Sequence, residues 1–119
     1  MGEIHNRMSQ DRARARLAQY VVSYVFDIPL DELVAATRRS PRIAFARQVA
    51  MYLAHVAFQL SLARVAIAFG RDRSTAAHAC HRIEDCRDDA RLDACLDDLE
   101  AFLRSAPCPD MPQPQELVL

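Results

Sequence analysis

Two amphipathic segments on either side of one glycine dominate the pattern of hydrophobic and polar positions. Residues 61–69 carry apolar side chains at helical spacing, namely Leu62, Val65, Ala66 and Phe69. Residues after Gly70 carry a second stripe of this kind, formed by Ala76, Ala79, Cys80 and Ile83. The pattern predicts a helix-turn-helix hinged at Gly70. The outward side of its second helix then consists of Ser74, Thr75, Ala77, His78, His81 and Arg82.

Apolar positions elsewhere predict four further helices. The first ends near Asp27 and has an apolar face of Leu17, Tyr20, Val21, Tyr24, Val25 and Ile28. A short helix over 30–37 buries Leu30, Leu33 and Val34. After a break at Pro41, a long helix from about Phe45 to Leu60 buries Val49, Leu53, Val56, Ala57 and Leu60. A last helix buries Leu92, Cys95, Leu96, Leu99, Phe102 and Leu103. The expected fold is all-α, a small bundle of about six helices with a helix-turn-helix.

The length and composition predict one folded domain. A chain of 119 residues, 51% of them hydrophobic, can bury one core. We expect the domain over residues 11–105, after a polar and flexible N-terminal segment, 1–10. Pro107, Pro109, Pro112 and Pro114 predict a disordered tail over 106–119. The sequence shows neither a membrane-spanning run nor a signal peptide, so we expect a cytoplasmic protein without a membrane partner.

The charge changes sign along the chain, although the net charge is only −1. Residues 1–83 contain 12 arginines and 6 acidic residues, which gives +6. Residues 84–119 contain 3 arginines and 10 acidic residues, which gives −7. All 15 basic residues are arginine, a residue that binds phosphate or guanine with two hydrogen bonds, although a GC-rich genome produces the same bias. The predicted helix-turn-helix therefore lies in the basic part.

Catalytic and metal chemistry are disfavoured by spacing. The histidines and cysteines of the second half lack the paired spacing of zinc ligands; they are His78, Cys80, His81, Cys86 and Cys95. Asp72, Ser74 and His78 have the residue types of a hydrolase triad, but Ser74 and His78 lie one turn apart on one helix. With only two glycines, the chain has no phosphate-binding P-loop. We predict no enzyme activity, no metal and no cofactor, and cysteines that are reduced, two of them in the core.

The blocks around the predicted helix-turn-helix resemble a known family. They are residues 46–54 (ARQVAMYLA), Ser61-Leu62, and residues 69–84 (FGRDRSTAAHACHRIE). Over residues 15–86 the chain is similar to the C-terminal DNA-binding domain of the bacterial replication initiator DnaA. Hydroxyls, imidazoles and guanidinium groups on the outward helix face suit a phosphate-lined groove. No counterpart of the initiator's ATPase module is present, so the resemblance implies a free-standing reader domain.

The resemblance implies a role for eight residues in binding double-stranded DNA. Arg39 matches an arginine that enters the minor groove. Asp72, Arg73 and Ser74 match positions that read base edges in the major groove. Thr75 and His78 match neighbours that contact a thymine methyl group or the backbone, and Arg71 and Arg47 match basic residues near phosphates. Asp72 also suits an N-cap whose carboxylate accepts from the N–H of Ser74 or Thr75.

The chain departs from the family pattern at several of these positions. It has one glycine in the turn, Gly70, where the family usually has two. Arg73 replaces a histidine and Ser74 a threonine, which changes the expected base preference, since arginine commonly selects guanine. His55 stands where a lysine is frequent, and Arg64 occupies a first-turn site that is usually acidic and where a positive charge opposes the helix dipole.

The acidic last helix allows more than one interpretation. Its carboxylates are Asp88, Asp89, Asp93, Asp97, Asp98 and Glu100. In the simplest interpretation they form a solvated face turned away from DNA. They could instead form a docking surface for a basic partner or weaken non-specific DNA binding by repulsion.

Three functional hypotheses follow. The first is a sequence-specific protein for double-stranded DNA, bound at DnaA-box-like sites on the nucleoid as an accessory factor or regulator of replication initiation. The second is a regulator that binds proteins of the initiator pathway and binds DNA weakly. The third is a transcriptional regulator with the same fold. No coiled-coil signature is present, so we expect a monomer.

Overall fold

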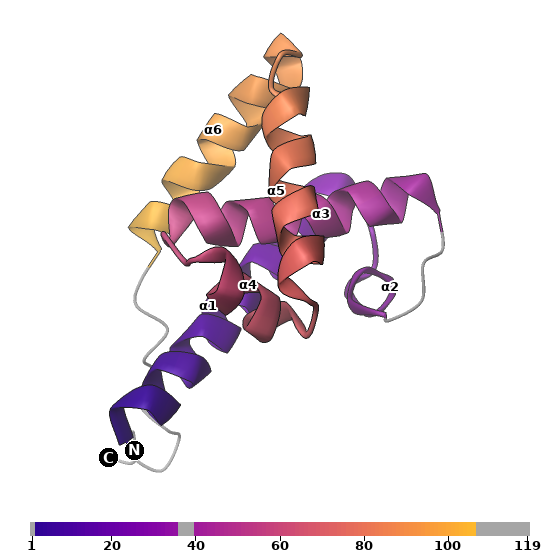
Figure 1. Ribbon diagram of the computed structural model, residues 1–119. Coiled ribbons are helices and arrows are strands. Elements are labelled where there is room, and N and C mark those ends of the chain that lie inside the picture. The colour runs from indigo at the N-terminus through magenta and orange to yellow at the C-terminus, as the bar shows by residue number, and fades with distance from the viewer. Residues whose placement is uncertain (1, 36–39, 107–119) are drawn as a thin grey trace, which may run out of the picture.

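The computed structural model describes residues 2–35 and 40–106, with side chains from Asn6 onward, and these residues form helices and no strand. Figure 1 shows the six helices: α1 (Gly2–Phe26), α2 (Leu30–Val34), α3 (Pro41–Ala57), α4 (Leu62–Phe69), α5 (Arg73–Cys86) and α6 (Ala90–Ser105). The predicted all-α fold with a helix-turn-helix, formed by α4 and α5, is confirmed.

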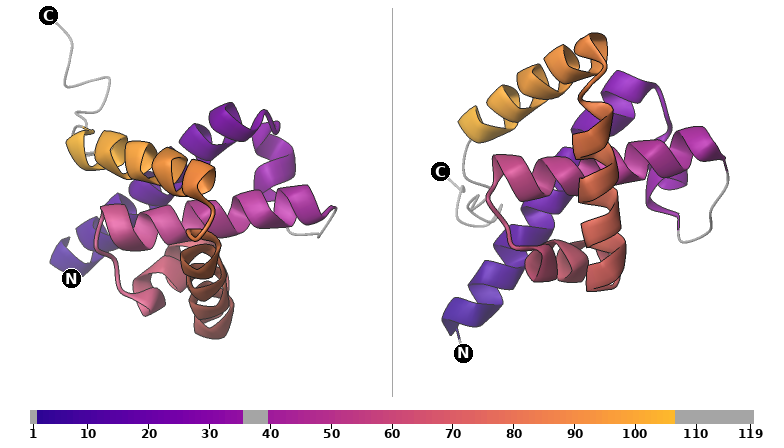
Figure 2. Two further views of the ribbon diagram at one scale, coloured as in Figure 1. Left: turned by 90° about the horizontal axis from the view of Figure 1, so that it is seen from above. Right: turned by 45° about the horizontal axis from the view of Figure 1, so that its top comes forward.

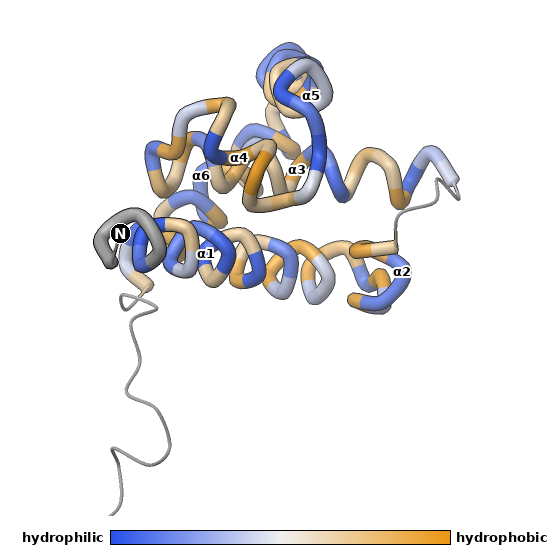
Figure 3. Tube along the Cα trace, turned by 60° about the horizontal axis from the view of Figure 1, so that its bottom comes forward, coloured by the Kyte–Doolittle hydropathy of each residue, from blue (hydrophilic) through white to orange (hydrophobic). Residues whose placement is uncertain are grey.

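Helix α3 is central and contacts each of the other five helices. Figures 1 and 2 show α5 crossing α3 steeply, while α6 folds back over α3. Figure 3 shows that α1 and α5 lie on opposite sides of α3 and α4. The molecule therefore presents α5 on one face and α1 on another.

The core forms where neighbouring helices meet α3. Its buried side chains include Ala46, Val49, Ala50 and Leu53, and several of them are small enough for close helix approach. Leu53 contacts no solvent, and full burial of a leucine contributes about 1.5–3 kcal/mol. The predicted burial of Val49, Leu53, Ala57 and Leu60 is confirmed, whereas Val56 is half-buried.

The start of α3 differs from the prediction. Pro41 is the first helical residue, so the helix begins four positions before Phe45. The Ser40 hydroxyl accepts from the Ile43 N–H at 3.2 Å, and proline suits a first helical position because its missing N–H would have no intrahelical partner. The end is also earlier than Leu60: α3 stops at Ala57, and Gln59 has a φ of 57°.

Residues 2–10 belong to α1, which starts earlier than predicted. No proline occurs between Gly2 and Phe26, so none interrupts the helix over this span. The flexibility predicted for 1–10 stays a prediction. The proline-rich tail lies outside the described residues except for Ala106, and so does Cys108.

Three predicted apolar faces include residues that are exposed, and only the face of α1 is rotated as a whole. Tyr20, Tyr24 and Val25 of α1 are exposed, because Ala15, Ala18 and Val22 face the core instead. Val34 of α2 and Phe102 of α6 are exposed by 48% and 56%. In α6 the core-facing leucines are Leu96, Leu99 and Leu103, as predicted. No helix in the described part of the chain is long and apolar enough to cross a membrane.

Candidate nucleic-acid interface

The turn between α4 and α5 is a Schellman motif. Gly70 has φ 65° and ψ 38°, a left-handed conformation that glycine adopts without a side-chain clash. The Arg71 N–H donates to the Ala66 carbonyl at 2.8 Å, and the Gly70 N–H donates to the Ile67 carbonyl at 3.2 Å. One glycine is therefore sufficient to end α4 and direct the chain into α5.

Helix α5 packs through the stripe that the sequence predicted. Ala76, Ala79 and Ile83 are at most 1% exposed, and Cys80 is 9% exposed. The alanines let α5 lie close to α3 and α4, which fixes its rotation about its own axis. Burial raises the pKa of the Cys80 thiol to about 11, so this thiol stays protonated at neutral pH.

The opposite side of α5 brings together most of the predicted site residues. Arg73, Ser74, Thr75 and His78 are exposed along the first turns, and Asp72 is exposed just before them. His81 and Arg82 continue the exposed side, whereas Ala77, predicted to point outward, is half-buried. The result is a polar face with hydroxyl, imidazole and guanidinium groups.

Asp72 is the N-cap of α5, but not through its side chain. Its backbone is extended, and its carbonyl accepts from the Ala76 N–H at 3.1 Å. The predicted hydrogen bond from the N–H of Ser74 or Thr75 to the carboxylate is wrong. The Thr75 hydroxyl lies 3.5 Å from Asp72 Oδ1 instead. The first N–H groups of α5 therefore have no side-chain acceptor from Asp72, an arrangement that suits an anion.

Two of the predicted phosphate-binding arginines border one small cleft. Arg47 and Arg71 both line it, with Leu33, Val34 and Phe69 among the other lining residues. Arg47 also has a structural contact: its Nε donates to the Leu33 carbonyl at 2.8 Å, and its Nη2 donates to the Glu32 carbonyl at 3.1 Å. These are carbonyls near the end of α2, where a cation is favourable.

Arg39 lies outside the described residues, so its predicted place in a minor groove stays a prediction. The chain is anchored directly after it. Arg42, in the first turn of α3, donates hydrogen bonds to the carbonyls of Phe26 and Asp27 at the end of α1. The chain that follows Arg39 is thus fixed to the end of α1 through Arg42.

A groove runs along the flank of α5. It has a volume of about 270 Å³ and lies between α5, the second half of α3 and the start of α4. His55 and His81 both line it. His55 Nδ1 lies 2.6 Å from the Leu60 carbonyl oxygen, and because a carbonyl only accepts, Nδ1 carries the proton.

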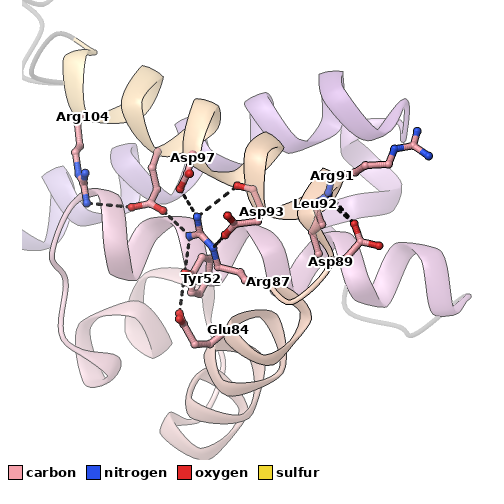
Figure 4. Close-up of polar contacts among 10 residues, drawn as sticks. Tyr52, Glu84, Arg87, Asp89, Arg91, Leu92, Asp93, Asp97 and Arg104 are labelled. Carbon is pink, nitrogen blue, oxygen red and sulfur yellow. Dashed lines mark hydrogen bonds and ion pairs between the residues drawn. The ribbon is translucent and has the colours of Figure 1, made fainter.

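Sequence reasoning missed a cluster of charges around Arg87, which connects α5 to α6 and α3 (Figure 4). Its guanidinium contacts Asp93 at 2.5 Å and Glu100 at 2.7 Å, and it also pairs with Asp97. It donates to the Tyr52 hydroxyl at 2.9 Å, and that hydroxyl donates to Glu84 at 2.8 Å. Three of the six carboxylates assigned to a solvated face therefore bind an arginine of their own chain.

The pKa shifts in this cluster have opposing causes. Burial by itself would lower the pKa of Arg87, but hydrogen bonds to Glu100, Asp93 and Tyr52 outweigh it and raise the pKa. Burial raises the pKa of the Tyr52 hydroxyl, and the hydrogen bond from Arg87 opposes that rise. Arg87 stays charged and Tyr52 stays neutral at physiological pH.

A second unpredicted pair joins α4 to α1. Arg64 Nε and Nη2 contact the two oxygens of Asp11 at 2.9 and 2.7 Å, and Asp11 is 5% exposed. The hydrogen bond to Asp11 is the main reason that the pKa of Arg64 is raised. The positive charge in the first turn of α4, unfavourable for the helix dipole, is thus compensated from α1.

No group of histidine, cysteine or carboxylate side chains in the described ranges is arranged to hold a metal ion. The described cysteines, Cys80, Cys86 and Cys95, are free thiols, and only Cys80 of the three is buried.

The chain is similar to part of several curated replication initiator proteins. The chain is 33% identical over 90 residues to the chromosomal replication initiator protein DnaA of Thermoanaerobacter sp. (strain X514), which covers 75% of this chain and 20% of that protein. It is 41% identical over 63 residues to chromosomal replication initiator protein DnaA 2 of Chlamydia muridarum (strain MoPn / Nigg), covering 53% and 14%. The chain therefore spans a fifth or less of the length of these relatives.

Two solved structures share the fold. One is a crystal structure of a DNA replication initiation factor, with a TM-score of 0.73 and 22% identity, which covers 85% of this chain and 31% of that one. The other is replication initiator DnaA bound to AMPPCP and single-stranded DNA, with a TM-score of 0.71 and 21% identity, covering 87% and 32%. The family described as bacterial dnaA protein helix-turn-helix matches residues 16–83, more than half of the sequence, and the chain belongs to that family.

Proposed function

We propose that this protein binds double-stranded DNA at DnaA-box-like sites and acts on the nucleoid as an accessory factor or regulator of replication initiation. The observation that carries the proposal is the division of α5 into two sides. The buried stripe fixes the helix on the bundle, and Arg73, Ser74, Thr75 and His78 are exposed opposite it. A helix held in this way can enter the major groove with its first turns against the bases.

Each exposed group suits a particular contact. Arg73 can donate two hydrogen bonds to guanine O6 and N7. Ser74 can bond to base edges, and the methyl group of Thr75 can contact the methyl group of thymine. His78, one turn after Ser74, can reach the next base or the backbone. We assign Asp72 to base reading as well, at the start of the same helix.

Phosphate contacts would orient the protein on the duplex. Arg71 and Arg47 border one cleft beside the start of α5, so one strand's backbone can run past both. We assign Arg39 to the adjacent minor groove, since it precedes the anchored first turn of α3. A minor-groove arginine favours narrow A·T-rich sequence.

Fluorescence anisotropy with two labelled duplexes tests the proposal. One duplex contains a DnaA box and the other contains the same bases in scrambled order, and both are titrated at several salt concentrations. We expect the box duplex to bind about 1,000-fold more tightly. Equal affinity for the two duplexes at every salt concentration would show that the chain does not read sequence.

The acidic helix gives less support to a protein-binding regulator than its sequence suggested. Asp93, Asp97 and Glu100 already pair with Arg87. Transcriptional regulation would use the same exposed face of α5, so the two DNA-binding hypotheses differ in where the protein binds on the chromosome. Genome-wide occupancy mapping distinguishes them: sites at origins favour replication, and sites at promoters favour transcription.

A further inference from the structure

A row of basic and aromatic side chains runs along the outer side of α1. Arg12, Arg16, Tyr20 and Tyr24 follow one another at intervals of four residues, and all four are exposed. Tyr20 is 51% exposed and Tyr24 is 88% exposed. Four residues advance about 6 Å along an α-helix, so the row extends over about 18 Å. We call it the α1 row.

The side chains of the α1 row make no polar or ring contact with the described part of the fold. In the described part of the chain none of the four side chains has a hydrogen bond, ion pair or ring contact, whereas Arg14 on the same helix lies over the Phe58 ring at 5.6 Å. The exposed side chains between Asn6 and Phe26 include three arginines and no carboxylate. The acid of this segment, Asp11, is buried and paired with Arg64. The row is therefore positively charged and uncompensated.

The row is also separate from the α5 face. Ala15, Ala18 and Val22 turn the other side of α1 toward the core, so the row points away from the bundle. Figure 3 shows α1 and α5 on opposite sides of the molecule. A duplex held by α5 would leave the α1 row accessible.

The side chains of the row suit a narrow polyanion that has unpaired aromatic bases. Arginines bind phosphates, and tyrosine rings stack on unpaired bases with little regard to sequence. The bases of a duplex are stacked on each other and cannot stack on tyrosine. A protein partner typically covers about 20–30 residues on each side, far more than one line of four side chains.

We propose that the α1 row binds single-stranded DNA, with phosphates on Arg12 and Arg16 and bases on Tyr20 and Tyr24. The choice of DNA as the nucleic acid rests on the proposed function, while the surface and the contacts do not.

Tyrosine fluorescence provides a direct test. The chain has three tyrosines and no tryptophan. Tyr52 is only 3% exposed, so Tyr20 and Tyr24 are the tyrosines on which a base can stack. Titration of the intact protein with a thymidine oligomer of about 15 nucleotides should quench this emission, and anisotropy of a labelled oligomer should give the affinity.

Paired variants assign the contacts. We expect the double substitution Tyr20→Ala with Tyr24→Ala to weaken oligomer binding by about tenfold or more. Arg12→Ala with Arg16→Ala should lower the salt slope of log affinity by about 0.7 for each arginine. The matched controls are Phe102→Ala and Arg91→Ala, which remove an exposed aromatic ring and an exposed arginine from α6 and should leave oligomer binding unchanged.

The duplex assay separates this proposal from the proposed function. Variants of the α1 row should keep duplex binding, and Arg73→Ala should weaken duplex binding and keep oligomer binding. Loss of oligomer binding in Arg73→Ala would mean that single strands occupy α5 and would overturn the proposal. Unchanged affinity in the double tyrosine variant would overturn it too. So would a concentration-dependent dimer that this variant abolishes, since the row would then be a contact between copies.

Discussion

The described arginines include two groups that differ in what their guanidinium groups contact. Arg42, Arg47, Arg64 and Arg87 bind carbonyls or carboxylates of neighbouring helices. Arg73, like the arginines of the α1 row, is exposed and has no such contact among the described residues. Composition alone could not make this division, because the engaged arginines meet partners that are distant in sequence. Arg64 and Asp11, for example, are 53 positions apart.

Arg73 provides a test of base reading. We expect Arg73→Ala to cost about 1–3 kcal/mol on the preferred duplex and less on a scrambled one, because the lost bonds are to a base edge. Anisotropy on both duplexes at one salt concentration measures the difference. Arg91→Ala, an exposed arginine on α6, is the control. An equal loss on both duplexes would assign Arg73 to the phosphate backbone.

Gly70 provides a test of the turn. A side chain at Gly70 would meet no atom within 4 Å, so the cost of Gly70→Ala comes from the left-handed backbone alone. We expect a loss of about 1–2 kcal/mol in the free energy of unfolding, measured by urea denaturation. Gly70→Asn should lose less, since asparagine tolerates this conformation. If the alanine variant were as stable as the natural protein, the turn would not require a left-handed residue.

Among the elements, those defined by local patterns were predictable and those defined by distant contacts were not. The α4–α5 pair followed from two apolar stripes and one glycine. The orientation of α1 did not, because its core side consists largely of Ala15 and Ala18, whose small side chains give a weak hydrophobic signal beside Tyr20 and Tyr24. The predicted start of α3 near Phe45 is wrong, although serine at the N-cap with proline after it, as in Ser40-Pro41, is a helix start signal.

The acidic side of α6 shows the same limit. Asp93, Asp97 and Glu100 recur at positions i, i+4 and i+7, which places them on one side of the helix. Periodicity could thus identify a continuous acidic side. It could not show that the chain turns back after α5 so that Arg87 meets this side.

We expect Arg87→Met to show that this cluster holds α6 against α5 and α3. Methionine keeps much of the side-chain volume but leaves Glu100, which is 12% exposed, without its cation from Arg87. The expected loss in the free energy of unfolding is about 1–3 kcal/mol, measured by urea denaturation. Arg91→Met on the exposed side of α6 is the control. Equal losses in the two variants would mean that the cluster contributes nothing specific.

At the scale of the whole molecule, the positions of the α5 face and the α1 row relative to each other depend on the contacts that attach α1 to the bundle. The Asp11 pair with Arg64 is the charged contact between α1 and α4, and the carboxylate is almost fully buried. Since removal of Arg64 leaves the buried Asp11 carboxylate without its cation, Arg64→Met alone should cost more stability than the double substitution.

A double-mutant cycle measures this attachment. We expect Asp11→Asn and Arg64→Met to destabilise the protein singly, with a coupling free energy of about 1–3 kcal/mol in urea denaturation. Arg12→Met, whose side chain is exposed on the same helix, should change stability little. Additive single effects would show that the two residues act independently and that α1 is held by apolar contacts alone.

The central position of α3 has a consequence for how the molecule responds to damage. Each of the other five helices packs against α3. The surface of α3 is therefore covered by these helices together. Loss of one peripheral helix would expose part of this apolar surface to water and weaken the packing of the remaining helices. A fragment lacking α1 or α6 would therefore not keep the fold of the remaining helices intact. Cleavage between helices would destabilise the whole bundle.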